Sequence, residues 1–218
     1  DNQGPFNLDG VSVDTTLELA EGDDLVLNNA FSANANANLT LSAAAGEATL
    51  DINSVTATVP DYDATTATAE YSVESGVTLM LADSQADARP IDGAGDVSVS
   101  MFGGSNDTDL SNVTASLTLV PASAVVFDGS FASGETVTVN GDYELDITAL
   151  AIDDLPGAFD LDGTNLIVTA EQAEALTVTG ASSVTVKDLD DTPDADLTGI
   201  DADLPLTLDL GKTDTVDF

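Results

Sequence analysis

A pattern of closely spaced aspartates, D-x-D-L-[ST]-[GN]-[IV], occurs twice in the chain, at residues 107–113 and 194–200. In an extended segment, side chains two residues apart point to the same side, so the two aspartates of each motif would present paired carboxylates. Carboxylates followed by loop carbonyls make an oxygen-rich site that suits Ca²⁺. The alternative is a turn in which the aspartates accept hydrogen bonds from nearby backbone N–H groups. The paired residues are Asp107 with Asp109 and Asp194 with Asp196.

Further carboxylates stand close to this motif or beside glycine turns. Three aspartates just before the second motif could complete its site, and two glycine turns, "IDGAGD" and "FDLDG", carry two aspartates each. The sequence therefore predicts calcium binding by a wider set of aspartates. These additional candidates are Asp188, Asp190, Asp191, Asp92, Asp96, Asp160 and Asp162.

The charge balance restricts the possible partners. The chain has 40 acidic residues and three basic ones, Arg89, Lys187 and Lys212, which gives a formal net charge of −37. Such a chain repels itself unless divalent cations or high salt screen the charge. Nucleic-acid binding is excluded because it needs Lys and Arg at the phosphates, and an anionic membrane surface would repel the chain.

The residue types that are missing argue against catalysis. The chain contains neither Cys nor His, which excludes thiol chemistry, Cys/His metal centres and Ser-His-Asp catalysis. It has no Trp and three Tyr, so a platform for stacking sugars is poorly supplied. We expect no enzymatic activity. No apolar run approaches the roughly 18 residues of a membrane span, so we expect no membrane insertion.

The apolar pattern indicates an all-β fold. Val, Leu and Ile alternate with Thr, Ser and Asp in many short stretches, which is typical of strands with one buried and one wet face. Gly, Asn, Asp and Pro interrupt these stretches roughly every eight to twelve residues. Only residues 82–88 and 169–175 favour single helical turns.

An internal repeat organises the chain. Residues 76–120 align with residues 163–207 without a gap, and 15 of the 45 aligned positions are identical. We predict two tandem copies of a β unit, at 28–125 and 126–218, after a leading strand segment at 1–27 that could pair with another subunit. We favour an antiparallel β-sandwich-like unit, because no regular period of about 20–30 residues indicates the alternative, a β-solenoid.

The stretch "NLIVTAEQAEALTVTGASSVTVKDLDDTPDADLTGI" (165–200) resembles repeats of very large secreted bacterial surface proteins. These are RTX-type adhesins and surface-layer proteins. The features in common are a strand, then [AS]-x-Q-A, "TVTG", "VTV.DL" and "ADL[ST]GI". The resemblance implies export, calcium dependence and a structural or adhesive role.

These observations predict an extracellular, calcium-dependent structural protein or module at the cell surface. It would be part of a surface layer, filament or adhesin and would self-assemble into a homo-oligomer or polymer. One alternative is a soluble β module that binds a partner or a cell-surface glycan. Another is a halophile's acidic surface protein, whose carboxylates serve solvation in salt and bind no specific metal.

Overall fold

The computed structural model describes most of the chain from residue 71 onward and short stretches before it. It divides the chain into two compact units, unit 1 with residues 1–100 and 108–118, and unit 2 with residues 101–107 and 119–218. The predicted segments 1–27, 28–125 and 126–218 stay predictions. The described residues are 7–8, 15–19, 24–26, 32–33, 39–43, 48–51, 71–101, 104–189 and 194–209.

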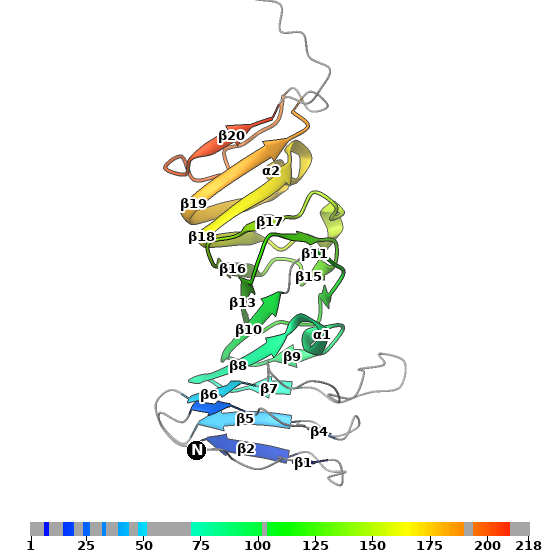
Figure 1. The fold of residues 1–218 in the computed structure, drawn as a ribbon, viewed down its shortest axis with the longest axis vertical. Helices are drawn as coiled ribbons and strands as arrows, with labels where there is room; N and C mark the ends of the chain where they lie inside the picture. Colours follow the sequence, from blue (N-terminus) through cyan, green and yellow to red (C-terminus); the bar gives the residue numbers. More distant parts are fainter. Residues whose placement is uncertain are drawn as a thin grey trace, which may run out of the picture. The chain divides into compact units, whose positions relative to one another are not determined.

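Unit 1 is built from short strands and one helical turn (Figure 1). Two of the described strands cross the division: the last residue of β10, Met101, and the last three residues of β13 belong to unit 2. The described elements are β1 (Asn7–Leu8), β2 (Thr15–Leu19), β3 (Asp24–Val26), β4 (Ser32–Ala33), β5 (Leu39–Ala43), β6 (Ala48–Asp51), β7 (Tyr71–Val73), β8 (Val77–Ala82), α1 (Asp83–Ala86), β9 (Ile91–Asp92), β10 (Asp96–Met101), β12 (Asp109–Leu110) and β13 (Ser116–Pro121).

The strands of unit 1 stack in two parallel rows. One row runs β2-β5-β7-β9 and the other runs β3-β6-β8-β10. The chain alternates between the rows, from β2 to β3, β5 to β6, β7 to β8 and β9 to β10. Each such passage is one coil of a β-solenoid, and successive coils pair in parallel.

Unit 2 has the same construction with longer strands. Its rows run β11-β14-β17-β18 and β16-β18-β19-β20, again with parallel pairing. Strand β18 belongs to both rows because it bends at a bulge next to Gly163. The described elements are β11 (Gly104–Asn106), β14 (Val125–Phe127), β15 (Ser130–Phe131), β16 (Thr136–Asn140), β17 (Glu144–Asp146), the 3-10 turn Ile152–Asp154, β18 (Ala158–Thr169), α2 (Ala170–Ala175), β19 (Thr177–Lys187) and β20 (Leu206–Leu208).

The all-β prediction is confirmed, as are the two helical turns, but the antiparallel sandwich is wrong. Its alternative, the solenoid, is the observed architecture. The sequence shows no regular period because the coils differ in length. Opposed residues are 18 positions apart for Thr78 and Asp96, and 22 for Val184 and Leu206. For Leu39 and Tyr71 the offset is 32.

Alternation along each strand fills the interior with apolar rows. In unit 1, Leu50, Leu79 and Val97 follow one another in register and are all buried. In unit 2, Phe159 lies opposite Val178 and also contacts Phe131 edge-on, with ring centroids 5.7 Å apart. A fully buried Leu or Phe contributes about 2 kcal/mol relative to an exposed one, so these rows hold the coils together.

Two glycines at matching positions of the repeat bend the chain between rows. Gly93 has φ +111° and Gly180 has φ +109°, a region that side chains rarely adopt. A Cβ at either position would also collide with backbone of the preceding coil, at Val73 or at Leu161. The close approach of two coils explains why glycine stands at both places.

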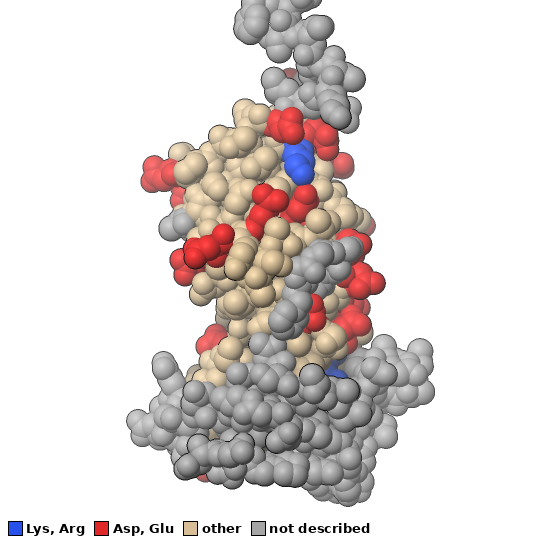
Figure 2. All heavy atoms as spheres, viewed as in Figure 1, with Lys and Arg blue, Asp and Glu red and all other residues tan. Residues whose placement is uncertain are grey.

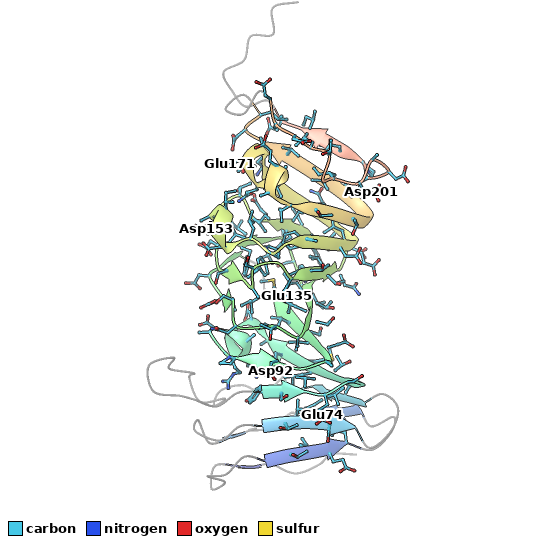
Figure 3. All side chains as sticks on the ribbon, turned by 180° about the vertical axis from the view of Figure 1, so that it is seen from behind. Glu74, Asp92, Glu135, Asp153, Glu171 and Asp201 are labelled. Carbon is cyan, nitrogen blue, oxygen red and sulfur yellow. The ribbon has the colours of Figure 1, made fainter. Side chains whose placement is uncertain are left out.

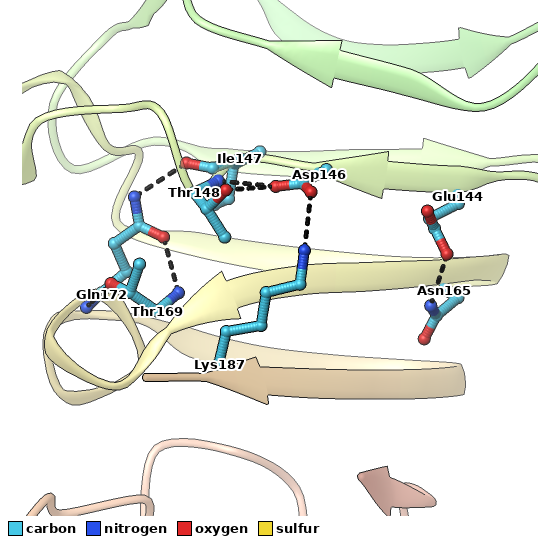
Figure 4. Close-up of polar contacts among 8 residues, drawn as sticks. All are labelled: Glu144, Asp146, Ile147, Thr148, Asn165, Thr169, Gln172 and Lys187. Carbon is cyan, nitrogen blue, oxygen red and sulfur yellow. Dashed lines mark hydrogen bonds and ion pairs between the residues drawn. The ribbon is translucent and has the colours of Figure 1, made fainter. Parts of the chain in front are cut away.

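A buried glutamine fastens each helical turn. Gln172 in α2 accepts a hydrogen bond from the N–H of Thr169 at 2.9 Å, and its Nε2 donates to the carbonyl of Ile147 at 2.7 Å (Figure 4). The same Nε2 donates to the carbonyl of Leu150 at 2.9 Å. Gln85 in α1 likewise accepts from the N–H of Ala82 at 2.7 Å. Gln172 thus ties α2 to backbone more than 20 residues earlier in the chain.

Replacing this glutamine by the nearly isosteric Gln172→Glu should destabilise the fold by about 3 kcal/mol, because two buried carbonyls lose their donors and a charge enters the interior. Thermal or urea unfolding followed by circular dichroism measures the change. The exposed neighbour provides the control, since Glu171→Gln should leave stability nearly unchanged. Equal stabilities of the two variants would contradict the assignment.

Candidate functional site

The two aspartate motifs fold into equivalent turns. Asp109 accepts a hydrogen bond from the N–H of Ser111 at 2.9 Å, and Asp196 accepts one from the N–H of Thr198 at 3.0 Å. Backbone and side-chain hydrogen bonds from Thr198 hold the pKa of the Asp196 carboxyl below its ordinary value. At these two positions the structure has the turn that was the alternative to a metal site.

Each turn is also attached to the end of the helical turn before it. The N–H of Asp109 donates to Oδ1 of Asp87 at 2.8 Å, and the N–H of Asp196 donates to Oε1 of Glu174 at 2.9 Å. Positions 87 and 174 are equivalent in the repeat, so either acid makes the same bond. Each motif is therefore joined to the preceding helical turn by a hydrogen bond between two acidic residues, from the backbone N–H of one to the carboxylate of the other.

The motifs are joined to the coil before them by backbone bonds as well. Ile91 and Val113 form an isolated parallel bridge, and Val178 and Ile200 form its counterpart. The N–H of Ile91 donates to Asn112, and the N–H of Val178 donates to Gly199. The repeat seen in the sequence therefore extends to individual hydrogen bonds.

The other predicted ligands are spread over the surface. Seven of them are exposed, and Asp190 and Asp191 lie outside the described residues. Within the part of the chain that the structure describes, no group of three or more acidic residues could hold a metal ion. Calcium binding stays a prediction. The exposed candidates are Asp107, Asp188, Asp194, Asp92, Asp96, Asp160 and Asp162.

The acidic side chains are dispersed rather than gathered. On the face shown in Figure 2, the Asp and Glu side chains of the described residues form several separate areas with other residues between them. The acids labelled in Figure 3 come from different coils and point into solvent; all are exposed. They are Glu74, Asp92, Glu135, Asp153, Glu171 and Asp201.

The strand register keeps like charges apart. Neighbouring strands lie about 4.8 Å apart, so two carboxylates in register would repel at close range. Among the strand pairings described above, no acidic residue lies opposite another. Asp160 has Thr138 on one side and Thr179 on the other, and Glu144 lies opposite Asn165. Other strand acids lie opposite apolar residues, as Asp162 does opposite Ala181, so uncharged residues separate the charges from one coil to the next.

One ion pair connects strands that are not neighbours. Lys187 Nζ lies 3.0 Å from Oδ2 of Asp146, across the intervening β18 (Figure 4). Partial burial acts to raise the pKa of Asp146. Hydrogen bonds from the side chain and backbone of Thr148, together with Lys187, outweigh it, so that the pKa lies below its ordinary value. A separation of 41 residues hid this pair from sequence reasoning.

A second basic residue is buried in unit 1. Arg89 is 4% exposed, its guanidinium carbon lies 4.7 Å from the ring centroid of Tyr71, and its Nε donates to the carbonyl of Gln85 at 3.0 Å. Burial raises the pKa of Tyr71, and the Arg89 charge only partly offsets this. Arg89 therefore serves packing and the helical turn, a role that its sequence context did not reveal.

Comparisons with protein-family models, with curated proteins and with solved structures found no match. In the described residues, no helix has the length and apolar character needed to cross a membrane.

The ion pair should give stability a specific pH dependence. Because the pKa of Asp146 is lower in the folded chain, its ionised form stabilises the fold at neutral pH, and this contribution is lost as the pH falls through the folded pKa. We expect Asp146→Asn to be about 1 kcal/mol less stable at pH 7, with the gap to wild type closing below the ordinary value of 3.8. Urea unfolding at several pH values measures it. The control Lys187→Met should show a similar loss at pH 7, and a gap that does not narrow in acid would contradict the assignment.

The charge spacing can be tested beside Asp160. Thr179→Asp places a second carboxylate in register with Asp160, whereas Thr179→Asn has the same size without the charge. We expect the aspartate variant to be less stable than the asparagine variant by about 0.5–1 kcal/mol, with the difference shrinking as NaCl is added. Thermal unfolding over a salt series measures it. A difference that is absent at low salt would show that register does not constrain the charges.

Proposed function

We propose that this chain is an extracellular, non-catalytic structural module, a segment of a surface layer, filament or adhesin. The observation that carries the proposal is the stacking of parallel coils in register, with the same turn, glutamine and glycine used again 87 residues later. A solenoid grows by adding coils, each of which contacts only its neighbours. Such a fold supplies length and stiffness.

We further propose that calcium binds at the two motif turns. Each turn offers two carboxylates, Asp87 with Asp109 and Glu174 with Asp196, beside exposed backbone. Calcium takes about six to eight oxygen ligands, so water and backbone carbonyls would have to supply the rest. The ion would reduce the repulsion between the two carboxylates of each turn.

The spacing of acids along the strands favours a second candidate. Strand acids whose neighbours in the next coils are uncharged, as for Asp160 and Glu144, avoid close repulsion without any bound metal. Such a surface suits a protein that works in concentrated salt, where mobile ions screen the remaining charge. In this case the protein would still be a structural module, but its stability would follow ionic strength rather than calcium.

The calcium-dependent and the salt-adapted candidates can be distinguished by adding back salts to chelator-treated protein. We expect added CaCl₂ to raise the melting temperature by more than NaCl of equal ionic strength, and electron microscopy to show polymers that come apart with EDTA. The double variant Asp109→Asn/Asp196→Asn keeps an acceptor oxygen for each turn but removes the charge, and should lose the calcium-specific rise. Equal effects of the two salts would favour the salt-adapted candidate. Solitary molecules under all conditions would contradict the structural role.

A further inference from the structure

The strand β20 presents an open edge. It pairs on one side with β19, through Val184 with Leu206 and Val186 with Leu208, and in the described part of the chain it has no other strand partner. Leu206 is 42% exposed and Leu208 is 50% exposed, although both continue apolar rows that are fully buried in β19. The outer side of β20 therefore combines unpaired strand edge with exposed leucines.

The internal repeat shows what kind of element fits this edge. Leu206 is equivalent to Leu119 in β13, 87 residues earlier. Leu119 is fully buried, and β13 has a further strand, β16, beside it. The element that covers this position in the first copy is thus one more coil of the same fold, with Val137 and Val139 turned inward.

In a second copy of the chain, unit 1 offers a strand that could pair with this edge. Strand β2 pairs with β5 and has no second strand partner among the described residues. Along β2, Leu17 is half-buried, Glu18 is exposed and Leu19 is buried. This order of apolar, polar and apolar residues matches Leu206, Thr207 and Leu208 in a parallel register. It also places Glu18 opposite a threonine, as Asp160 lies opposite Thr179 within the chain.

We propose that β20 of one copy pairs in parallel with β2 of the next, with Glu18 opposite Thr207. This inference rests on the proposed structural function and names the contact by which the module would assemble. The contact joins two different surfaces, so each copy can continue it and chains of copies result. Because each copy carries a charge of −37, assembly should need salt or divalent cations and should weaken at low ionic strength.

The register makes the contact testable by charge. Thr207 is exposed and lies opposite Thr185 within its own chain, so Thr207→Glu should fold normally but place a carboxylate against Glu18 of the next copy. We expect sedimentation velocity to show large species for wild type and for the neutral control Thr207→Gln, and monomers for Thr207→Glu. Circular dichroism and melting temperature verify folding. The double variant Glu18→Lys/Thr207→Glu should assemble again, because it restores an attractive pair.

The outcomes separate this inference from the proposed function. If Thr207→Glu assembles as wild type does, the contact is wrong while the structural role stands, and the same holds if the double variant fails to recover. If wild type stays monomeric in calcium and in concentrated salt, both the contact and the structural role are contradicted. If the double variant assembles again, β2 is identified as the partner of β20. A partner formed by residues that follow β20 in the same chain would not be affected by a change at position 18.

Discussion

The constraint on which this structure depends is the in-register stacking of parallel coils. Every residue on a strand has as its nearest neighbours the equivalent residues of the coils before and after it, about 4.8 Å away. An apolar residue placed inward adds to a continuous row, as Leu50, Leu79 and Val97 do. A charge placed outward would face another charge unless the next coil supplies a neutral residue. On the described strands the acids are compatible with this stacking because the residues opposite them, such as Thr179 opposite Asp160 and Asn165 opposite Glu144, are uncharged.

The same constraint explains the use of the few specialised residues. Coils that lie this close leave no room for a Cβ where the chain turns sharply, so Gly93 and Gly180 occupy those places. The side-chain amide of Gln172, in the helical turn α2, donates to the carbonyls of Ile147 and Leu150 and so supplies the hydrogen bonds that these two buried groups need. The aspartate motifs also join coils, because the backbone N–H of Asp109 or Asp196 donates to an acidic side chain of the preceding helical turn. These residues recur 87 positions later because the same backbone geometry recurs there.

The sequence predicts the local structure well and the topology poorly. Alternation marks the strands, and the matching Gln and Gly residues mark the corners, since each depends on neighbours a few residues away. Parallel and antiparallel strands with one wet face alternate in the same manner, so β8 and β10 carry no sign of their direction. Coil lengths from 18 to 32 residues conceal the period, although 87 is close to four coils of about 22. The aspartate turns depend on Asp87 and Glu174, which no local motif connects to them.

The ion pair between Asp146 and Lys187 bears on how the solenoid would respond to tension. When a stack of coils is pulled along its length, an end coil can peel away by releasing only the one beside it. This ion pair joins β17 to β19, which are separated by β18. Detaching β19 therefore also means breaking a hold on β17, which makes three strands yield together rather than in succession. In a module exposed to shear, this ion pair would raise the force at which the coils begin to unfold from one end.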